Sequence, residues 1–304
     1  MLPGAATMAD KDIYRAGTIK RERRTAAQIE QLDRQIIEVL QDDHPQSVRH
    51  VFYRMTDPRL PEPVEKSDRG YRQVQDRVKK LRRNERIPYG WIADATRRGY
   101  HTYTYADGGD FLSRVAGLYR GDLWADSEFY IEVWCESRSI AGVIQNECDE
   151  LAVSLYPCGG FASITLAYEA AKAINWQWRQ GKSCVIFYIG DYDPAGVLID
   201  TALERELREH LDDDVDLEFI RLGVTPEQIT YYDLPGKPRK EGDRRALHVK
   251  ETVEAEAMPA QVLRDLLRDE IEAYLPVDAL EVVKVAEESE RAWLREMAAL
   301  RAAE

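Results

Sequence analysis

Long apolar runs are missing from this chain of 304 residues. No stretch of about 18 consecutive apolar residues occurs anywhere in the sequence. Within the first 25 residues, charged side chains recur from Asp10 onward, where a secretory signal would have an apolar segment. These absences predict a protein without a membrane span or a signal peptide, and we expect a cytoplasmic location.

Cysteine and histidine are scarce as well. The four cysteines lie far apart with no C-x-x-C pair, and the five histidines show no ligand spacing. Neither a disulfide scaffold nor a zinc finger is therefore expected. No Walker A motif occurs either, so an ATP site is not predicted. The cysteines are expected to be small buried thiols: Cys135, Cys148, Cys158 and Cys184.

Acidic charge dominates the chain as a whole but not its first third. The formal net charge is −13. Residues 11–100 hold 21 lysines and arginines against 14 acidic residues, a net charge of +7, whereas residues 101–304 have a net charge of −19. This asymmetry is typical of a basic binding module joined to an acidic one. Charge alone leaves open that a helical surface is simply rich in arginine.

Three helices and a hairpin are predicted in the first part of the chain. Apolar residues at helical spacing indicate a helix after Thr25, a shorter helix over residues 47–55 and a third helix over residues 71–86. The segment 87–105, with β-branched and aromatic residues, suits a short hairpin. Three helices followed by a hairpin are the order of a winged helix, so we expect a winged-helix DNA-binding domain over residues 11–105.

The third predicted helix has a strongly basic face. In a winged helix this helix ordinarily enters the major groove, where basic side chains bind phosphates. A solvated helix face with no ligand is the alternative. The residues expected to contact DNA lie on this helix and in the hairpin: Arg72, Lys79, Lys80, Arg82, Arg83, Arg97 and Arg98.

Strands and helices alternate in the middle of the chain. Strands are predicted over residues 129–136, 151–158, 183–193 and 215–223, each followed by a helix or a loop. Such an order implies the α/β class, with a mainly parallel sheet flanked by helices. The expected division of the chain is a disordered N-terminus (1–10), the winged helix (11–105), this α/β domain (106–225), and a basic loop with C-terminal helices (226–304).

Three acidic residues fall at the predicted carboxyl ends of strands. Glu136 ends the first strand, and Asp191 and Asp193 end the third. Ligands of open α/β sheets bind at such strand ends. Side chains of a strand alternate, so the two aspartates face one side and can share Mg²⁺. The alternative is that they cap the helix that begins near Pro194.

The segments VWCESRS and IGDYDPAG resemble the pattern of a Toprim domain, in which a glutamate closes the first strand and D-x-D closes the third. The resemblance implies a Mg²⁺ site formed by Glu136, Asp191 and Asp193. It implies that the aspartates bind the metal and that the glutamate also works as general acid/base.

The segment SVRHVFY on the second helix carries a further resemblance. It is similar to a signature of the topoisomerase VI A subunit and of the related meiotic double-strand-break transesterase. The resemblance implies that Tyr53 is the nucleophile and that Arg49, one helical turn earlier, lies beside it. Phe52 stands where the family has a first tyrosine. An amphipathic core tyrosine is the alternative for Tyr53.

Three functions stay open at this point. The first is a compact phage- or plasmid-type relative of the topoisomerase VI A subunit, which would cut DNA through a 5′-phosphotyrosyl link. The second is a Mg²⁺-dependent Toprim nuclease that cuts by hydrolysis, as in plasmid defence, and the third is a DNA-binding module without catalysis. The expected partners are double-stranded DNA, a second copy of the chain, and, for strand passage, a separate ATPase subunit. In that homodimer we expect Tyr53 of one protomer to serve the acids of the other.

Overall fold

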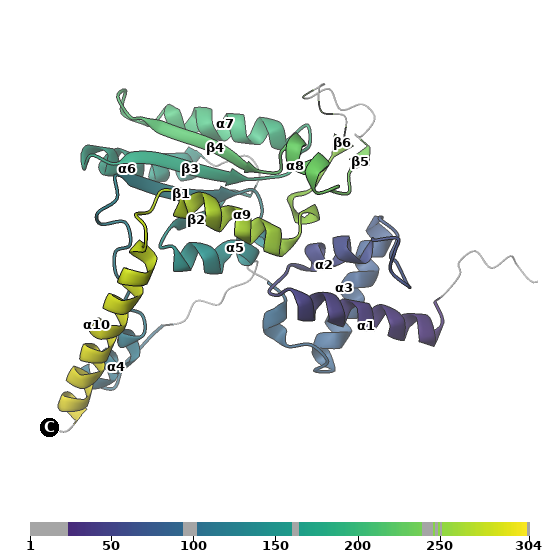
Figure 1. The fold of residues 1–304 in the computed structure, drawn as a ribbon, viewed down its shortest axis with the longest axis horizontal. Helices are drawn as coiled ribbons and strands as arrows, with labels where there is room; N and C mark the ends of the chain where they lie inside the picture. Colours follow the sequence, from purple (N-terminus) through teal and green to yellow (C-terminus); the bar gives the residue numbers. More distant parts are fainter. Residues whose placement is uncertain are drawn as a thin grey trace, which may run out of the picture.

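A four-stranded parallel sheet forms the centre of the protein (Figure 1). The computed structural model describes residues 24–93, 102–159, 164–238, 246, 249 and 251–302. The strand order is β2-β1-β3-β4, so β1 and β3 are direct neighbours. The strands are β1 (Phe129–Cys135), β2 (Ser154–Pro157), β3 (Ser183–Ile189) and β4 (Leu217–Gly223). This sheet confirms the predicted α/β class.

Helices cover both faces of the sheet (Figure 1). Alternate residues of β3 belong to two different apolar cores: Val185 and Phe187 to one, Ile186 and Tyr188 to the other. The run of apolar residues in β3 is continuous because the strand is buried on both sides. The covering helices are α5 (Arg138–Glu150) and α9 (Ala260–Glu272) on the first face, with α6 (Ile164–Arg179) and α7 (Gly196–Arg208) on the second.

Three helices form the N-terminal part of the described chain. They are α1 (Ala26–Asp42), α2 (Val48–Met55) and α3 (Asp68–Arg83). Thr25 begins α1 with a capping box, in which its hydroxyl accepts from the Gln28 amide and the Gln28 side chain accepts from the Thr25 amide. The third helix begins three residues earlier than predicted, because the Ser67 hydroxyl caps it by accepting from the Gly70 amide.

The middle of the predicted hairpin over residues 87–105, residues 94–101, lies outside the described residues. The flanking segments that are described contain a 3₁₀ turn, η1 (Tyr89–Trp91), and an isolated bridge between Gln46 and Ile92, with no hairpin strand. The three helices therefore have the order of a winged helix, while the wing itself is untested.

The N-terminal helices pack directly on the sheet region. Asp43, just after α1, accepts hydrogen bonds from the Gln261 amide (3.1 Å) and from the Arg264 side chain, both on α9. Arg264 also donates to the Pro45 carbonyl. These contacts join two segments that are more than 200 positions apart in the sequence.

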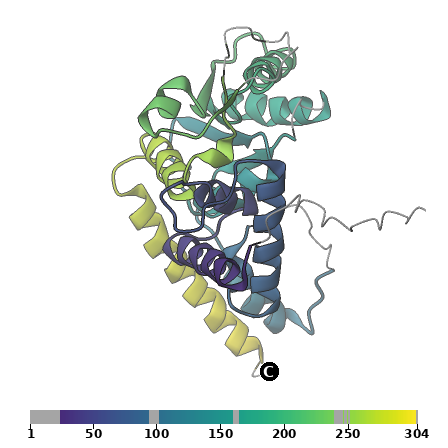
Figure 2. The same ribbon diagram turned by 90° about the vertical axis from the view of Figure 1, so that its right-hand side faces the viewer.

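The last part of the chain has short elements followed by two longer helices. The short elements are α8 (Pro226–Tyr231), the antiparallel pair β5 (Lys237–Pro238) and β6 (Glu251–Thr252), and η2 (Ala255–Ala257). After α9, the final helix α10 (Ala279–Ala302) packs against α4 (Gly108–Ala116). Figure 1 shows this pair projecting from the sheet, and Figure 2 shows α10 as one long yellow helix.

A buried acid fixes α10 to the segment after α4. The Glu287 carboxylate, 5% exposed, accepts from the Gly121 amide and pairs with Arg120 and Arg291.

Among the described helices, none has the length and apolar character needed to cross a membrane. All four cysteines are free thiols, three of them buried and Cys158 half-buried.

Candidate active site

Glu136 and Asp191 meet at the carboxyl ends of neighbouring strands. The Glu136 amide donates to the carbonyl of Ile189, which extends the pairing of β1 with β3 by one residue. β3 ends at Ile189 and is followed by Gly190 and Asp191. The Asp191 amide donates to Oε2 of Glu136 at 3.0 Å. The strand order that places β1 beside β3 thus brings together two acids 55 positions apart in the sequence.

The Asp191 side chain lies in a half-buried acidic environment. Its Oδ1 accepts from the Ala255 amide at 2.8 Å. Burial, together with the negative charges of Glu136 and Glu256, raises the pKa of Asp191 to about 8. Burial also raises the pKa of Glu136. These carboxyl groups disfavour one another's charged forms, so a bound cation would stabilise them as anions.

Asp193 serves in part as a helix cap. Its Oδ1 accepts from the amides of Ala195 (2.7 Å) and Gly196 (2.6 Å), at the start of α7. A Cβ atom at Gly196 would lie 2.2 Å from the Asp191 carbonyl oxygen, so this tight turn requires glycine. The helix-capping role expected as the alternative thus applies to Oδ1 of Asp193, and Oδ2 takes no part in it.

The donor set fits Mg²⁺, which commonly takes only one or two carboxylates together with waters and phosphate oxygens. Within the described part of the chain, no group of three histidines, cysteines or acids is arranged to hold a metal ion as it stands. In that same part, Glu136 Oε1, Asp191 Oδ2 and Asp193 Oδ2 have no hydrogen-bond donor. Each acid thus has one carboxylate oxygen without a donor among the described residues.

Two acids that the sequence did not indicate complete the surroundings of Asp191. An antiparallel bridge between Tyr192 and Val253, with two bonds of 2.8 Å, holds η2 against the D-x-D loop. It places Glu254 and Glu256 beside the site. Glu256 is 6% exposed and accepts from the Ser139 hydroxyl. The only sequence signal is alternation, since both acids stand between buried apolar residues from Val253 onward.

Tyr53 contacts the segment that carries Glu254 and Glu256. Its ring is buried in the core of the helical region, 6% exposed, with its centroid 5.4 Å from that of Phe52. Its hydroxyl hydrogen-bonds Glu254, and burial and this neighbouring carboxylate raise the pKa of Tyr53 well above its usual value. Arg49, one turn earlier on α2, forms an ion pair with the same Glu254. The ring is therefore a core residue, whereas the hydroxyl belongs to a polar cluster.

The basic face of α3 is largely solvent-exposed and lies apart from the acids. Arg82 is half-buried; its guanidinium lies 4.5 Å from the centroid of the Tyr89 ring, and it donates to the Tyr89 carbonyl. Arg97 and Arg98 lie outside the described residues. The exposed members of the predicted DNA-contact set are Arg72, Lys79, Lys80 and Arg83.

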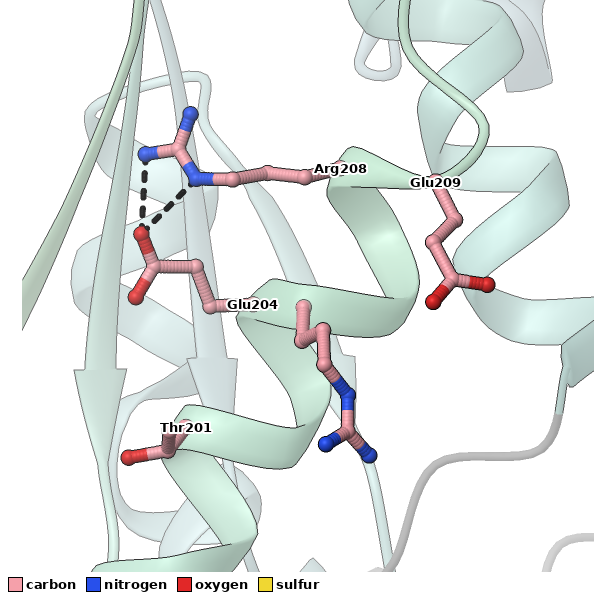
Figure 3. Close-up of a pocket in the computed structure, with 5 residues that line it drawn as sticks. Thr201, Glu204, Arg208 and Glu209 are labelled. Carbon is pink, nitrogen blue, oxygen red and sulfur yellow. Dashed lines mark hydrogen bonds and ion pairs between the residues drawn. The ribbon is translucent and has the colours of Figure 1, made fainter.

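A surface pocket of about 390 Å³ lies along α7 (Figure 3). Glu204 and Arg208 pair across one side of it at 2.8 Å. It contains none of the predicted site residues. The remaining lining residues are Thr201, Arg205 and Glu209.

Comparison with known proteins yields no relative for this chain: no family model, no curated protein and no solved structure matches it. The class defined by fold and site is thus an α/β protein whose acids meet at the ends of its central strands.

Proposed function

We propose that the protein is a Mg²⁺-dependent DNA-cleaving transesterase similar to the A subunit of topoisomerase VI. The observation that carries this proposal is that Tyr53 and Asp191 contact one short segment of the chain, Tyr53 through the Glu254 side chain and Asp191 through the Ala255 amide. Phosphodiester cleavage needs a nucleophile and a metal-binding acid cluster close to one phosphate, and this shared segment links the two groups.

In the proposed step, the Tyr53 oxygen forms a bond to phosphorus and the bond from phosphorus to the 3′ oxygen breaks. The product is a 5′-phosphotyrosyl link and a free 3′ hydroxyl. Glu136 supplies the proton to the leaving 3′ oxygen, and burial, which raises its pKa, favours its proton-carrying form. The proton of the phenol passes to solvent water.

Asp191 and Asp193, with Glu136, would hold the Mg²⁺ ion. When bound, the ion neutralises charge that develops on the phosphate oxygens. Asp191 orients its carboxylate through the Ala255 amide, and Asp193 through the first amides of α7. Both side chains are held by backbone donors before any ligand arrives, which favours a defined geometry.

DNA binding in this proposal belongs to the helical region, interpreted as a winged helix with α3 in the major groove. The substrate is double-stranded DNA. The active unit is a homodimer, because a two-fold dimer offers one equivalent site to each strand of a duplex. Strand passage would require a separate ATPase subunit.

Trapping of the covalent intermediate tests the proposal. Supercoiled DNA is incubated with the protein and Mg²⁺, the reaction is quenched with denaturant, and protein-linked DNA is quantified. We expect an adduct with the wild-type protein, none with Tyr53→Phe, and none in excess EDTA. Tyr192→Phe is the matched control, since this tyrosine neighbours the D-x-D acids yet has no proposed chemical role. An adduct that persists in Tyr53→Phe would contradict the assignment of the nucleophile.

Hydrolysis is a second candidate, and the environment of Tyr53 favours it. The hydroxyl is buried beside a carboxylate that opposes its ionisation, which disfavours attack by the phenol. A Toprim nuclease would instead use water at the same acids. It would leave free 5′ phosphates, and cleavage would persist in Tyr53→Phe but disappear in Asp191→Asn.

A further inference from the structure

Three cationic side chains from different parts of the chain lie next to Tyr53 or next to its neighbour Glu254. Arg49 comes from α2, Lys66 from the loop before α3, and Lys237 from β5. The Lys66 ammonium lies 5.4 Å from the centroid of the Tyr53 ring and donates to the Gly236 carbonyl at 2.8 Å. That second contact fixes its position next to β5, and hence near Lys237.

One carboxylate holds this cationic group together. Glu254 pairs with Arg49, and its Oε1 lies 3.2 Å from the Lys237 ammonium. Its side chain is 23% exposed, so the cluster is open to solvent on one side. The Lys66 ammonium donates to a neutral carbonyl, and burial followed by the nearby charge of Lys237 lowers its pKa. The cluster thus contains more positive charge than Glu254 neutralises.

Glu254 is poorly suited to take a proton from Tyr53. Although burial acts in the opposite direction, hydrogen bonds and charge from Arg49, with help from Tyr53 and Lys237, hold the pKa of Glu254 below its usual value. Its charge simultaneously raises the pKa of Tyr53. Transfer of the phenolic proton to this carboxylate is therefore strongly unfavourable, so Glu254 is an anion bound in a cationic site and no general base.

We propose that Arg49, Lys66 and Lys237 form a phosphodiester-binding site that Glu254 occupies in the free protein. The inference rests on the proposed function and names the groups that receive the scissile phosphate. A DNA phosphate offers the same kind of oxygens to the same three cations. Its arrival displaces the Glu254 carboxylate and places a phosphodiester, which also carries one negative charge, beside the Tyr53 hydroxyl. Glu254 then restrains the nucleophile until DNA is bound.

Direct binding measurements test the site without any cleavage. A short DNA duplex is titrated in metal-free buffer at several salt concentrations. Glu254→Gln should bind at least about threefold more tightly than wild type, because it removes a competing anion. Lys66→Gln and Lys237→Gln should each bind more weakly and reduce the salt slope by about 1. The exposed pair Glu169 and Lys172 on α6 provides matched controls, Glu169→Gln and Lys172→Gln.

Unchanged or weaker binding by Glu254→Gln would overturn the proposal. Lysine footprinting of the wild-type protein avoids any dependence on how variants fold: acetylation is compared with and without the duplex. Lys66 and Lys237 should be protected, whereas Lys172 should react equally in both samples. Equal reactivity of Lys66 and Lys237 with and without DNA would also overturn it.

The two proposals fail in different ways. If binding and footprinting give the expected results but Mg²⁺ produces no Tyr53-dependent adduct, the phosphodiester site stands and the transesterase function fails. If adducts form while the lysine and Glu254 variants bind DNA as the wild type does, the function stands and this site assignment fails.

Discussion

The Ala255 amide donates a 2.8 Å hydrogen bond to Oδ1 of Asp191, 64 positions earlier in the chain. This single bond connects the D-x-D loop with the segment that carries Glu254 and Glu256. It also fixes one oxygen of Asp191 and directs the other away from the backbone. Substitutions at Asp191 can therefore be designed to keep this bond while the charge is removed.

Asp191→Asn should stabilise the metal-free protein. The folded-state pKa of Asp191 is raised to about 8. The native state therefore binds more protons than the unfolded state between about pH 4 and 8, and stability falls as pH rises through that window. At pH 9 in EDTA, the variant should gain on the order of 2 kcal/mol over the wild type in denaturant unfolding. The gain should shrink toward pH 4, and the exposed control Asp213→Asn should show neither effect.

Asp193→Ala should have the opposite effect on stability. It deletes the acceptor of the Ala195 and Gly196 amides, which costs about 1 kcal/mol. Asp193→Asn keeps an acceptor oxygen at that position and should unfold close to the wild type. Both variants should lose the stabilisation that Mg²⁺ gives the wild-type protein. Equal stability of the alanine and asparagine variants would contradict the capping role.

Glu132 should make stability depend on pH in a mildly acidic window. This residue is fully buried on β1 and accepts from the Tyr130 hydroxyl and the Trp134 indole, both at 2.7 Å. Burial raises its pKa to about 6. The folded state thus holds the proton more tightly, and stability falls as pH rises from about 4.5 to about 6.

Glu132→Gln should remove that dependence, since an amide can still accept from Trp134 and can donate to Tyr130. The variant should exceed the wild type by about 2 kcal/mol above pH 7 and match it near pH 4.5. Denaturant unfolding at a series of pH values measures this difference. The exposed Glu218→Gln on β4 is the control. A wild-type profile that is flat between pH 4.5 and 7 would show that Glu132 is not the titrating group.

Charge reversal on α3 should weaken DNA binding. Lys79 and Arg83 are exposed, whereas Arg82 is engaged with Tyr89, so the first two are the better test positions. Lys79→Glu with Arg83→Glu should lower affinity and flatten its salt dependence. Lys172→Glu on α6 should have little effect. If the α3 double variant binds DNA with unchanged affinity and slope, this face is a solvated helix surface.

Mixing subunits tests which chain supplies Tyr53 to the acids. The sequence led us to expect Tyr53 of one protomer to serve the acids of its partner. In the structure, Tyr53 and Asp191 contact the same segment of one chain, which favours action within a subunit. Mixed dimers of Tyr53→Phe and Glu136→Ala should then form no covalent adduct. Nicking of one strand by exchanged mixed dimers would restore the arrangement across subunits.

The sequence predicted those parts of the site that follow from local pattern. Glu136 directly follows β1 and Asp191 comes two residues after β3, so both lie at the edge that these parallel strands share, and the sequence pattern indicates both. Glu254 was missed because its partners Arg49 and Lys237 are distant in sequence or lie in a loop without periodicity. Apolar spacing places the start of α3 three residues too late, because the first turn is set by the Ser67 cap and not by an apolar face. Contacts between distant segments leave no local pattern, and they determine what surrounds Tyr53.

The bridge between Tyr192 and Val253 has a consequence for the order in which the molecule matures. All four strands of the central sheet end by Gly223, so the sheet can form while the chain is still being synthesised. Residues 253–256 leave the ribosome later, and only then can η2 dock on the D-x-D loop and on Tyr53. A nascent chain would thus acquire its sheet first, and Glu254 and Glu256 would join the surroundings of Asp191 afterwards.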